Sequence, residues 1–274
     1  MNYRHSHHAG NIADVFKHYV LGLLLAALRA KVTPFCVIDS HAGAGFYALR
    51  QPGEFEAGIG RLWGERRDWP AFAPYLETVA VWNRGGQLKF YPGSPLIIQR
   101  ALRAQDRAVF LELNPEEYAV LHENLGAARG VALHRQDAWK ALAAFVPPRE
   151  NRGLVLIDPP YERPADFARA AEALGQLLGR WRNGLYALWY PVKSRAPIAR
   201  LHRAVRALAV EAQAVEFLIL PTDVEQRLNG SGLILVNPPW KLLDTLKETL
   251  PPLARLLAGA DGHPEVRLLD LTGP

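Results

Sequence analysis

The chain has 274 residues, enough for one large α/β domain with a sizeable core. Hydrophobic residues make up 49% of it and charged residues 22%, which is typical of a globular protein and excludes a disordered or fibrous one. The formal net charge of +5 suits a polyanionic partner, and a single cysteine, Cys36, excludes an intrachain disulfide and fits a reducing cytoplasm.

The first predicted element is a helix from residue 12 to about residue 30, with Asn11 as its N-cap. Its apolar stripe consists of Ile12, Val15, Phe16, Tyr19 and Leu23. Lys17 and His18 fall beside this stripe, which taken alone predicts ordinary surface charge. The apolar run is too short to span a membrane, and the His-rich segment before it lacks metal-site spacing. The sequence therefore predicts neither a membrane anchor nor a metal.

A buried strand over 35–39 runs into a loop of small residues, 40–45. An ordinary dinucleotide-binding unit would begin its helix directly after such a loop, but here residues from about 46 to 92 intervene. Their amphipathic stretch and interleaved Arg and Trp residues predict a small, mostly helical insertion. The delayed helix is expected at Ser94, with Pro95 at its first helical position.

From residue 108 onward, apolar strands alternate with amphipathic helices. The later strands are expected at 108–113, 131–134, 153–157, 185–190, 215–220 and 233–236, and residues 265–271 are a candidate for a further edge strand. The expected helices are 115–125, a short one ending near 145, 165–180, 196–209 and 241–258. This alternation predicts an α/β fold with a Rossmann-like, doubly wound sheet of seven strands, in a single domain over 1–274.

Acidic residues stand at the ends of successive predicted strands. Asp39, Glu112 and Asp137 share one edge of the sheet with Asp158, where open α/β sheets bind ligands. A Glu after the second strand suits a ribose diol, and an Asp after the third can accept from an adenine amino group. This arrangement predicts an adenosine-containing cofactor. NAD is the alternative, but it would require a fuller glycine fingerprint with a helix directly after the loop.

The strand 153–157 ends in Asp158-Pro159-Pro160-Tyr161. Pro159 keeps Asp158 extended, so the carboxylate is held rigidly at the sheet edge. The exocyclic amine of a base is a poor nucleophile, because its lone pair is delocalised into the ring. Asp158 and the Pro159 carbonyl could accept its protons and free that lone pair, while Tyr161 stacks on a flipped base. We favour this methyl-transfer site over the alternative, a strand-ending turn with a surface Asp.

A second motif, Asn237-Pro238-Pro239-Trp240, follows the last predicted strand and mimics the first. It comes after the cofactor-binding half of the sheet, and its acceptor is a neutral amide in place of a carboxylate. We therefore expect Asn237 to turn the chain and Asp158 to act in catalysis.

Six stretches carry a resemblance to a known family. They are His5-Ser6-x-His8-Ala9-Gly10-Asn11-x-Ala13-Asp14-Val15-x-Lys17-His18 and residues 41–45, 91–95, 156–161, 187–191 and 237–241. Through them, essentially the whole chain resembles the bacterial ribosomal RNA large subunit methyltransferase J family. The resemblance implies a Rossmann-like fold with a small helical insertion, S-adenosylmethionine as cofactor, and methylation of the N6 amine of one adenine in 23S rRNA.

The resemblance also implies residue roles. Asp158 would be the catalytic proton acceptor with Pro159 and Tyr161 beside it, and Tyr3 would contact the RNA. The residues implied to contact the cofactor are His18, His41, Ser94, Glu112, Asp137, Ala138 and Asp158, with Lys17 assisting. The role implied for His18 reverses its interpretation as surface charge.

Two other functions fit the catalytic motif alone. One is a DNA adenine-N6 methyltransferase, and the other is an RNA-binding protein that has lost activity on the same scaffold. The intact Asp158 and Glu112 argue against the second. The expected partner is 23S rRNA in the cytoplasm, without a membrane, a metal or an obligate protein partner.

Overall fold

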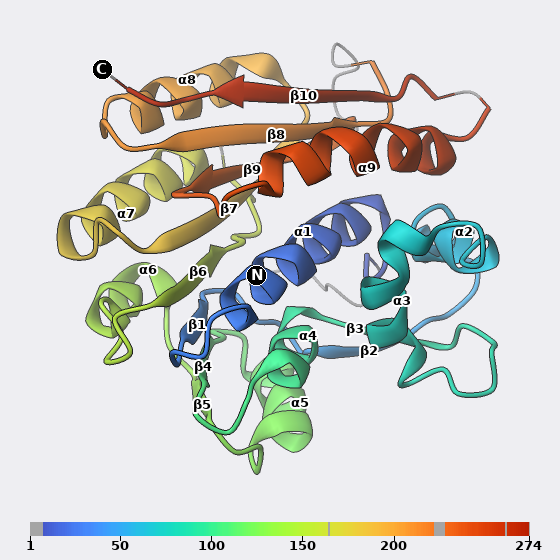
Figure 1. Ribbon diagram of the computed structural model, residues 1–274, viewed down its shortest axis with the longest axis horizontal. Helices are drawn as coiled ribbons and strands as arrows, with labels where there is room; N and C mark the ends of the chain where they lie inside the picture. The colour runs from blue at the N-terminus through green and yellow to red at the C-terminus, as the bar shows by residue number, and fades with distance from the viewer. Residues whose placement is uncertain (1–7, 164, 222–227, 261, 274) are drawn as a thin grey trace.

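The computed structural model describes residues 8–163, 165–221, 228–260 and 262–273. Its centre is one eight-stranded sheet with helices on both faces (Figure 1). In spatial order the strands are β10 (Glu265–Asp270), β8 (Ala212–Leu218), β9 (Gly230–Val236), β7 (Leu185–Val192), β6 (Gly153–Ile157), β1 (Cys36–Asp39), β4 (Arg107–Leu111) and β5 (Val131–His134). The predicted Rossmann-like α/β class is confirmed. The predicted count of seven strands is wrong, because the candidate edge segment pairs with β8 as β10.

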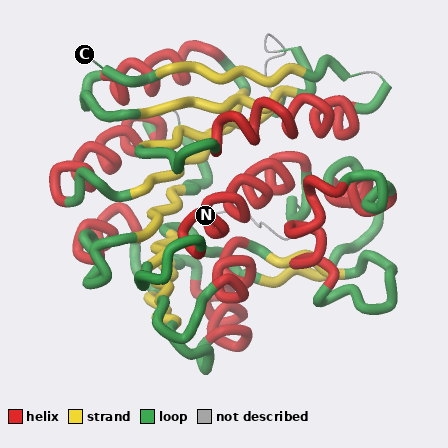
Figure 2. The backbone as a smooth tube through the Cα atoms, in the orientation of Figure 1, coloured by secondary structure: helices red, strands yellow, loops and turns green. Residues whose placement is uncertain are grey.

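The helices form two layers, which Figure 2 shows on either side of the yellow strands. One layer holds α1 (Ile12–Arg29), α4 (Ser94–Ala101), α5 (Pro115–Leu125) and α9 (Leu242–Ala258); the other holds α6 (Ala138–Ala141), a 3₁₀ turn η4 (Leu142–Phe145), α7 (Asp166–Arg180) and α8 (Arg195–Arg206). Successive strand residues face opposite layers. Val37 lies in the core under α1, and Ile38 lies in the core under α7.

Strand direction decides which loops share an edge. The strands β5, β4, β1, β6 and β7 are mutually parallel, so their carboxyl ends meet at one edge, here called the carboxyl edge. In contrast, β9 runs antiparallel to both β7 and β8. The chain therefore leaves β9 at the opposite edge of the sheet.

Between β1 and α4 the chain makes an excursion that Figure 1 shows at the right. It contains β2 (Phe46–Ala48), η2 (Glu54–Glu56), α2 (Ile59–Gly64), η3 (Pro70–Phe72), α3 (Ala73–Ala80) and β3 (Phe90–Pro92). The strands β2 and β3 pair antiparallel, with Phe46 opposite Pro92. This pairing returns the chain close to where it left, so α4 can still pack on the sheet as the delayed helix of the first unit.

The helix α1 is buried on more than one side. It contacts α4, α3, α9 and β9, so the predicted apolar stripe is only part of its buried surface. Lys17 and His18 are 5% and 1% exposed, and their interpretation as surface charges is wrong. No helix in the described part of the chain is long and apolar enough to cross a membrane.

Candidate active site

Asp158 lies at the carboxyl edge, directly after β6, and its side chain is 17% exposed. The buried ammonium of Lys17, on α1, lies 2.5 Å from Asp158 Oδ2 and 2.9 Å from Asp14 Oδ1. No described residue hydrogen-bonds Asp158 Oδ1. One carboxylate oxygen is thus held by the protein, and the other can accept from a ligand. Pro159, next in the chain, is buried.

Asp14 completes this charge cluster from within α1. Its Oδ2 accepts a 3.0 Å hydrogen bond from the Gly10 backbone N–H, and its own N–H donates to the N-cap Asn11. Burial acts to lower the pKa of Lys17, but the charges of Asp14 and Asp158 outweigh it and hold that pKa above its usual value. Lys17 therefore remains a cation that joins the start of α1 to the end of β6.

Tyr161 is held in place by one hydrogen bond and two ring contacts. Its φ of 48° is in the left-handed region, and its hydroxyl donates a 2.7 Å hydrogen bond to the backbone oxygen of Trp189. Its ring packs against Phe167 at 4.6 Å and edge-on against Trp189 at 5.9 Å between centroids. Burial raises the pKa of Tyr161 well above its usual value. The hydroxyl is therefore a neutral donor already engaged with the backbone.

Trp189 is a second aromatic group at the site. Its ring centroid lies 5.8 Å from the Lys17 ammonium. Its indole nitrogen is buried and has no hydrogen-bond partner among the described residues. Trp189 thus offers the site both an aromatic surface and an unused donor.

Glu112 links two loops of the carboxyl edge. Its Oε2 accepts from the Gly43 N–H at 2.8 Å, and its Oε1 accepts from the Asn114 N–H at 2.7 Å. Burial raises the pKa of Glu112, although these two N–H groups act to lower it. Gly43 has a φ of +62°, and a Cβ there would come within 2.5 Å of Tyr47 Oη. The loop therefore needs glycine to bring its backbone to the carboxylate.

Asp39 and His41 lie close enough to Asp158 for its charge to act on both. Asp39 is fully buried and accepts from the Ser94 hydroxyl at 2.7 Å. Burial, together with the charge of Asp158, raises the pKa of Asp39 to about 7. Burial lowers the pKa of His41 to about 4, although Asp158 and Asp137 act to raise it. The imidazole of His41 is therefore neutral at physiological pH.

The remaining sequence-predicted residues lie around this centre. Asp137 N-caps α6, where its Oδ1 accepts from the Trp139 N–H at 3.0 Å, and Ala138 is buried behind it. His18 is hydrogen-bonded to the hydroxyl of Tyr91 at 2.8 Å. Tyr3 lies outside the described residues.

Sequence reasoning missed the roles of Asp14 and Trp189. Asp14 stands three residues before Lys17, which is a usual spacing for an ion pair on a helix and could have indicated their contact. Trp189 falls within one of the stretches that resemble the family, but no local pattern shows that its ring reaches Lys17 and Tyr161.

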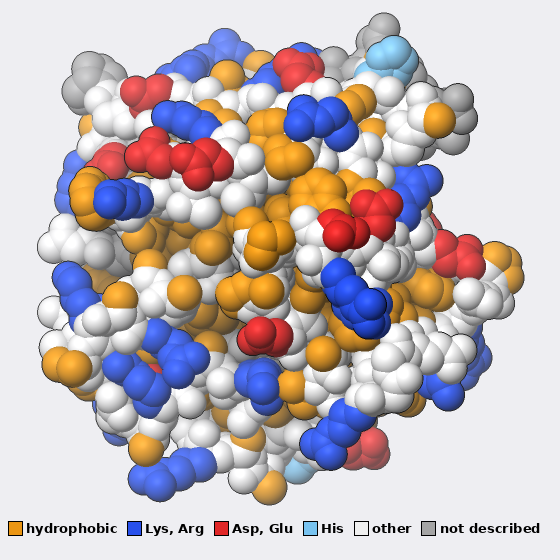
Figure 3. All heavy atoms as spheres, turned by 45° about the vertical axis from the view of Figure 1, so that its right-hand side comes forward, with side chains coloured by type: hydrophobic (Ala, Val, Ile, Leu, Met, Phe, Trp, Pro, Cys, Tyr) orange, Lys and Arg blue, Asp and Glu red, His pale blue; other side chains and the backbone are white. Residues whose placement is uncertain are grey.

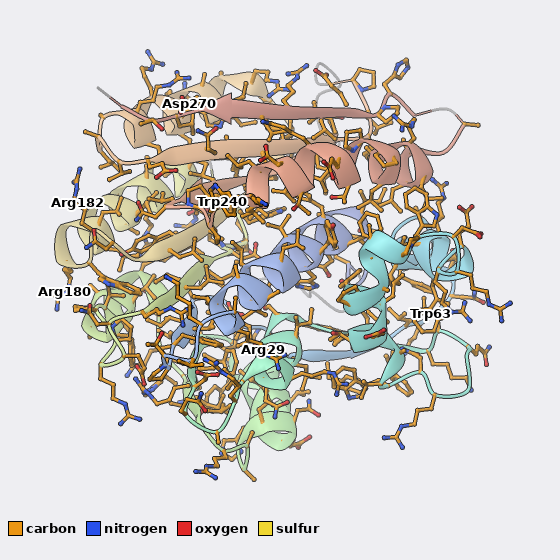
Figure 4. The ribbon with its side chains drawn as sticks, in the orientation of Figure 1. Arg29, Trp63, Arg180, Arg182, Trp240 and Asp270 are labelled. Carbon is orange, nitrogen blue, oxygen red and sulfur yellow. The ribbon has the colours of Figure 1, made fainter. Side chains whose placement is uncertain are left out.

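The second motif lies at the opposite edge of the sheet. Asn237 follows β9, and its Nδ2 donates to the backbone oxygens of Arg182 and Gly184 at 2.8 and 2.7 Å. Figure 4 labels Arg182 and also Trp240, which is 86% exposed. Asn237 turns the chain, as predicted, and cannot meet a ligand bound at the carboxyl edge.

Comparisons with known proteins agree with this geometry. The family model described as Ribosomal RNA large subunit methyltransferase D, RlmJ, matches residues 32–269. Ribosomal RNA large subunit methyltransferase J of Escherichia coli is 39% identical over 97% of this chain and 98% of its own, and the protein of the same name from Haemophilus influenzae is 39% identical over 94% of both chains. The crystal structure of protein LPL1258 from Legionella pneumophila has a TM-score of 0.89 at 33% identity, covering 95% of this chain and 98% of its own.

The position of Asn237 gives a first prediction. Replacing Asn237 with Ala removes two hydrogen bonds to backbone carbonyls and leaves a β-carbon residue at a φ of 53°. We expect the free energy of unfolding in urea to fall by about 1–3 kcal/mol. The variant that remains folded should keep most of its methyltransferase activity. A well-folded but inactive Asn237→Ala protein would contradict the assignment of the two motifs.

A second prediction concerns Asp39. Its pKa of about 7 in the folded protein lies above the ordinary value of 3.8, so its contribution to stability is present at low pH and is lost as pH rises through 7. Compared with Asp39→Asn, the wild type should lose up to about 4 kcal/mol of unfolding free energy between pH 4 and 8. Urea unfolding of both proteins measures this difference. Parallel pH curves would show that Asp39 ionises normally.

Proposed function

Because the chain belongs to the ribosomal RNA large subunit methyltransferase J family and is a methyltransferase of ribosomal RNA, we propose that it methylates the N6 amine of an adenine in 23S rRNA. The single observation that supports this most is the carboxylate of Asp158, held by Lys17 through one oxygen and open at the other. Tyr161 stands three residues further on, within the same rigid turn.

Asp158 acts on the nucleophile. Its free Oδ1 and the carbonyl oxygen of Pro159 accept the two protons of the amine, which draws the nitrogen toward tetrahedral geometry and frees its lone pair. The lone pair would then form an N–C bond to the methyl carbon as the bond from that carbon to the donor sulfur breaks, its electron pair remaining on the sulfur. The nitrogen, now positively charged and strongly acidic, would give up one proton to water. The fixed position of Asp158 supplies orientation, so little reorganisation is needed during the reaction.

We propose S-adenosylmethionine as the methyl donor, and the side chains at the carboxyl edge fit it. When bound, this cofactor supplies an electrophilic methyl group carried on a sulfonium cation. Glu112 would accept from the ribose hydroxyls and Asp137 from the adenine amine, with Ala138 beside it. His41, being neutral, adds no repulsion toward a cation. His18 and Ser94 support the site through Tyr91 and Asp39, and Lys17 through Asp158.

The substrate base must be single-stranded or flipped to reach Asp158. We assign Tyr161 to stack on it, because the ring is held in place by Trp189 and Phe167 while its hydroxyl is already engaged. Tyr3 stays a proposed RNA contact. We also propose that residues 46–92 are an insertion in a single methyltransferase domain, and that the protein acts in the cytoplasm, where its rRNA substrate is made.

The test is a labelled-methyl assay that compares rRNA, DNA and no nucleic acid, with nucleoside analysis of the product. We expect incorporation into rRNA as N6-methyladenosine. Incorporation into DNA alone would establish the DNA methyltransferase instead. No incorporation, with RNA still bound, would indicate the inactive RNA-binding alternative.

A third prediction isolates the catalytic group. The change Asp158→Asn keeps the shape of the side chain but removes the charge that draws on the amine, so turnover should fall by about 10²–10³-fold. Lys17 keeps Asp14 as a partner, so the variant should fold. Calorimetry should show cofactor affinity within a few-fold of the wild type. Parallel loss of cofactor binding would make Asp158 a binding residue.

A fourth prediction separates the ring of Tyr161 from its hydroxyl. Tyr161→Phe keeps the stacking surface and should be nearly neutral in single-turnover rate on an rRNA fragment. Tyr161→Ala should lose about 1–3 kcal/mol of stacking, or on the order of tenfold to a hundredfold in efficiency. Equal and severe losses in both variants would show that the hydroxyl takes part in the reaction.

A further inference from the structure

A pocket of about 400 Å³ opens beside Tyr161. Its walls come from the loop after β6 with the first turn of α7, and from the first turns of α8. The residues that form them include Tyr161, Arg163, Phe167, Ser194, Pro197 and Arg200. Asp158, Pro159 and Lys17 do not line it. The pocket is therefore next to the place of reaction but separate from it.

The pocket combines an apolar wall with positive charge. Phe167 is partly exposed, packs against Tyr161 and is joined in the lining by Pro197. The exposed side chains of Arg163 and Arg200 line the same space from two different elements, and neither forms an ion pair with another described residue. Glu162 is the one acidic residue in the lining, so the net charge of the lining is positive. Aromatic surfaces beside unpaired cations are the usual composition of sites for single-stranded nucleic acid.

The face shown in Figure 3 carries no single continuous path of positive charge for RNA. On the face shown in Figure 3, Lys and Arg side chains alternate with hydrophobic and acidic ones and do not gather into a continuous patch. On this face RNA would therefore meet separate cations, whereas Arg163 and Arg200 line one pocket together.

We propose that the pocket binds the nucleotide adjacent to the target adenosine in the RNA strand, an inference that rests on the proposed function. With the target base stacked on Tyr161, the strand must continue past the same ring. The neighbouring base lies against Phe167 and Pro197, and Arg163 and Arg200 bind its phosphate. A volume of about 400 Å³ is within the range of sites that hold one small molecule, and so suits a single nucleotide.

The first test compares two arginines on α8. Arg200 lines the pocket, whereas Arg203, one turn further along the same helix, is also exposed but lies outside the lining. Arg200→Ala should raise the KM for an rRNA fragment by about 5–20-fold and reduce the salt dependence of RNA binding by about one phosphate contact. Arg203→Ala should change neither, and both variants should bind the cofactor as the wild type does.

The second test pairs Phe167→Ala with substrates that carry an abasic nucleotide on one side of the target adenosine. In the wild type, removal of the base that occupies the pocket should raise KM by about 5–100-fold. The same removal should have little further effect in Phe167→Ala, because the contact is already lost.

The inference is overturned if wild-type protein methylates the fragment while Arg200→Ala and Arg203→Ala behave alike, or if the abasic and Phe167 effects are additive on both sides of the target. Fluorescence anisotropy with unmethylated RNA gives the same comparison without turnover. If wild-type protein methylates no rRNA, the proposed function fails, and the anisotropy series still decides whether the pocket binds RNA.

Discussion

The site depends on one buried cation. The Lys17 ammonium sits between Asp14 on its own helix and Asp158 at the end of β6, and its side chain is 6% exposed. An isolated charge in such a place is costly, and removing either partner leaves the other charges poorly compensated. This charge cluster therefore positions the groups of the site more than it stabilises the fold. It fixes the start of α1 against the end of β6, and so fixes the direction in which Asp158 presents its second oxygen.

The direction of the strands then determines which side chains meet at one edge of the sheet. Parallel strands bring Asp39, Glu112 and Asp158 to one edge, together with the glycine loop after β1. The antiparallel β9 carries Asn237 to the other edge, although its local sequence imitates the motif that begins at Asp158. The edge of the sheet at which a four-residue motif lies thus depends on the sense of the strand before it, which the four residues do not encode.

Local patterns in the sequence predict the bounds of those helices and strands whose ends are set by residues close together in the chain. The strand Val131–His134 and the helix Pro115–Leu125 were predicted with the observed bounds, because caps, prolines and apolar spacing mark their ends. Periodicity failed for Lys17, because α1 is covered on several sides and a polar position there is not an exposed one. Asp158, the second partner of Lys17, is 141 residues away, a separation at which only the resemblance to a family indicated a role.

The neighbouring carboxyl groups of Asp39 and Asp158 differ in burial and in the side chains that contact them. Asp39 is buried, accepts from Ser94 and has a pKa near 7, which the charge of Asp158 helps to raise. Asp158 is partly exposed and paired with a lysine whose pKa is raised. A carboxyl group that is buried near another negative charge tends to hold its proton. Asp39 is in that position, whereas the charge of Asp158 is compensated by the buried Lys17 ammonium.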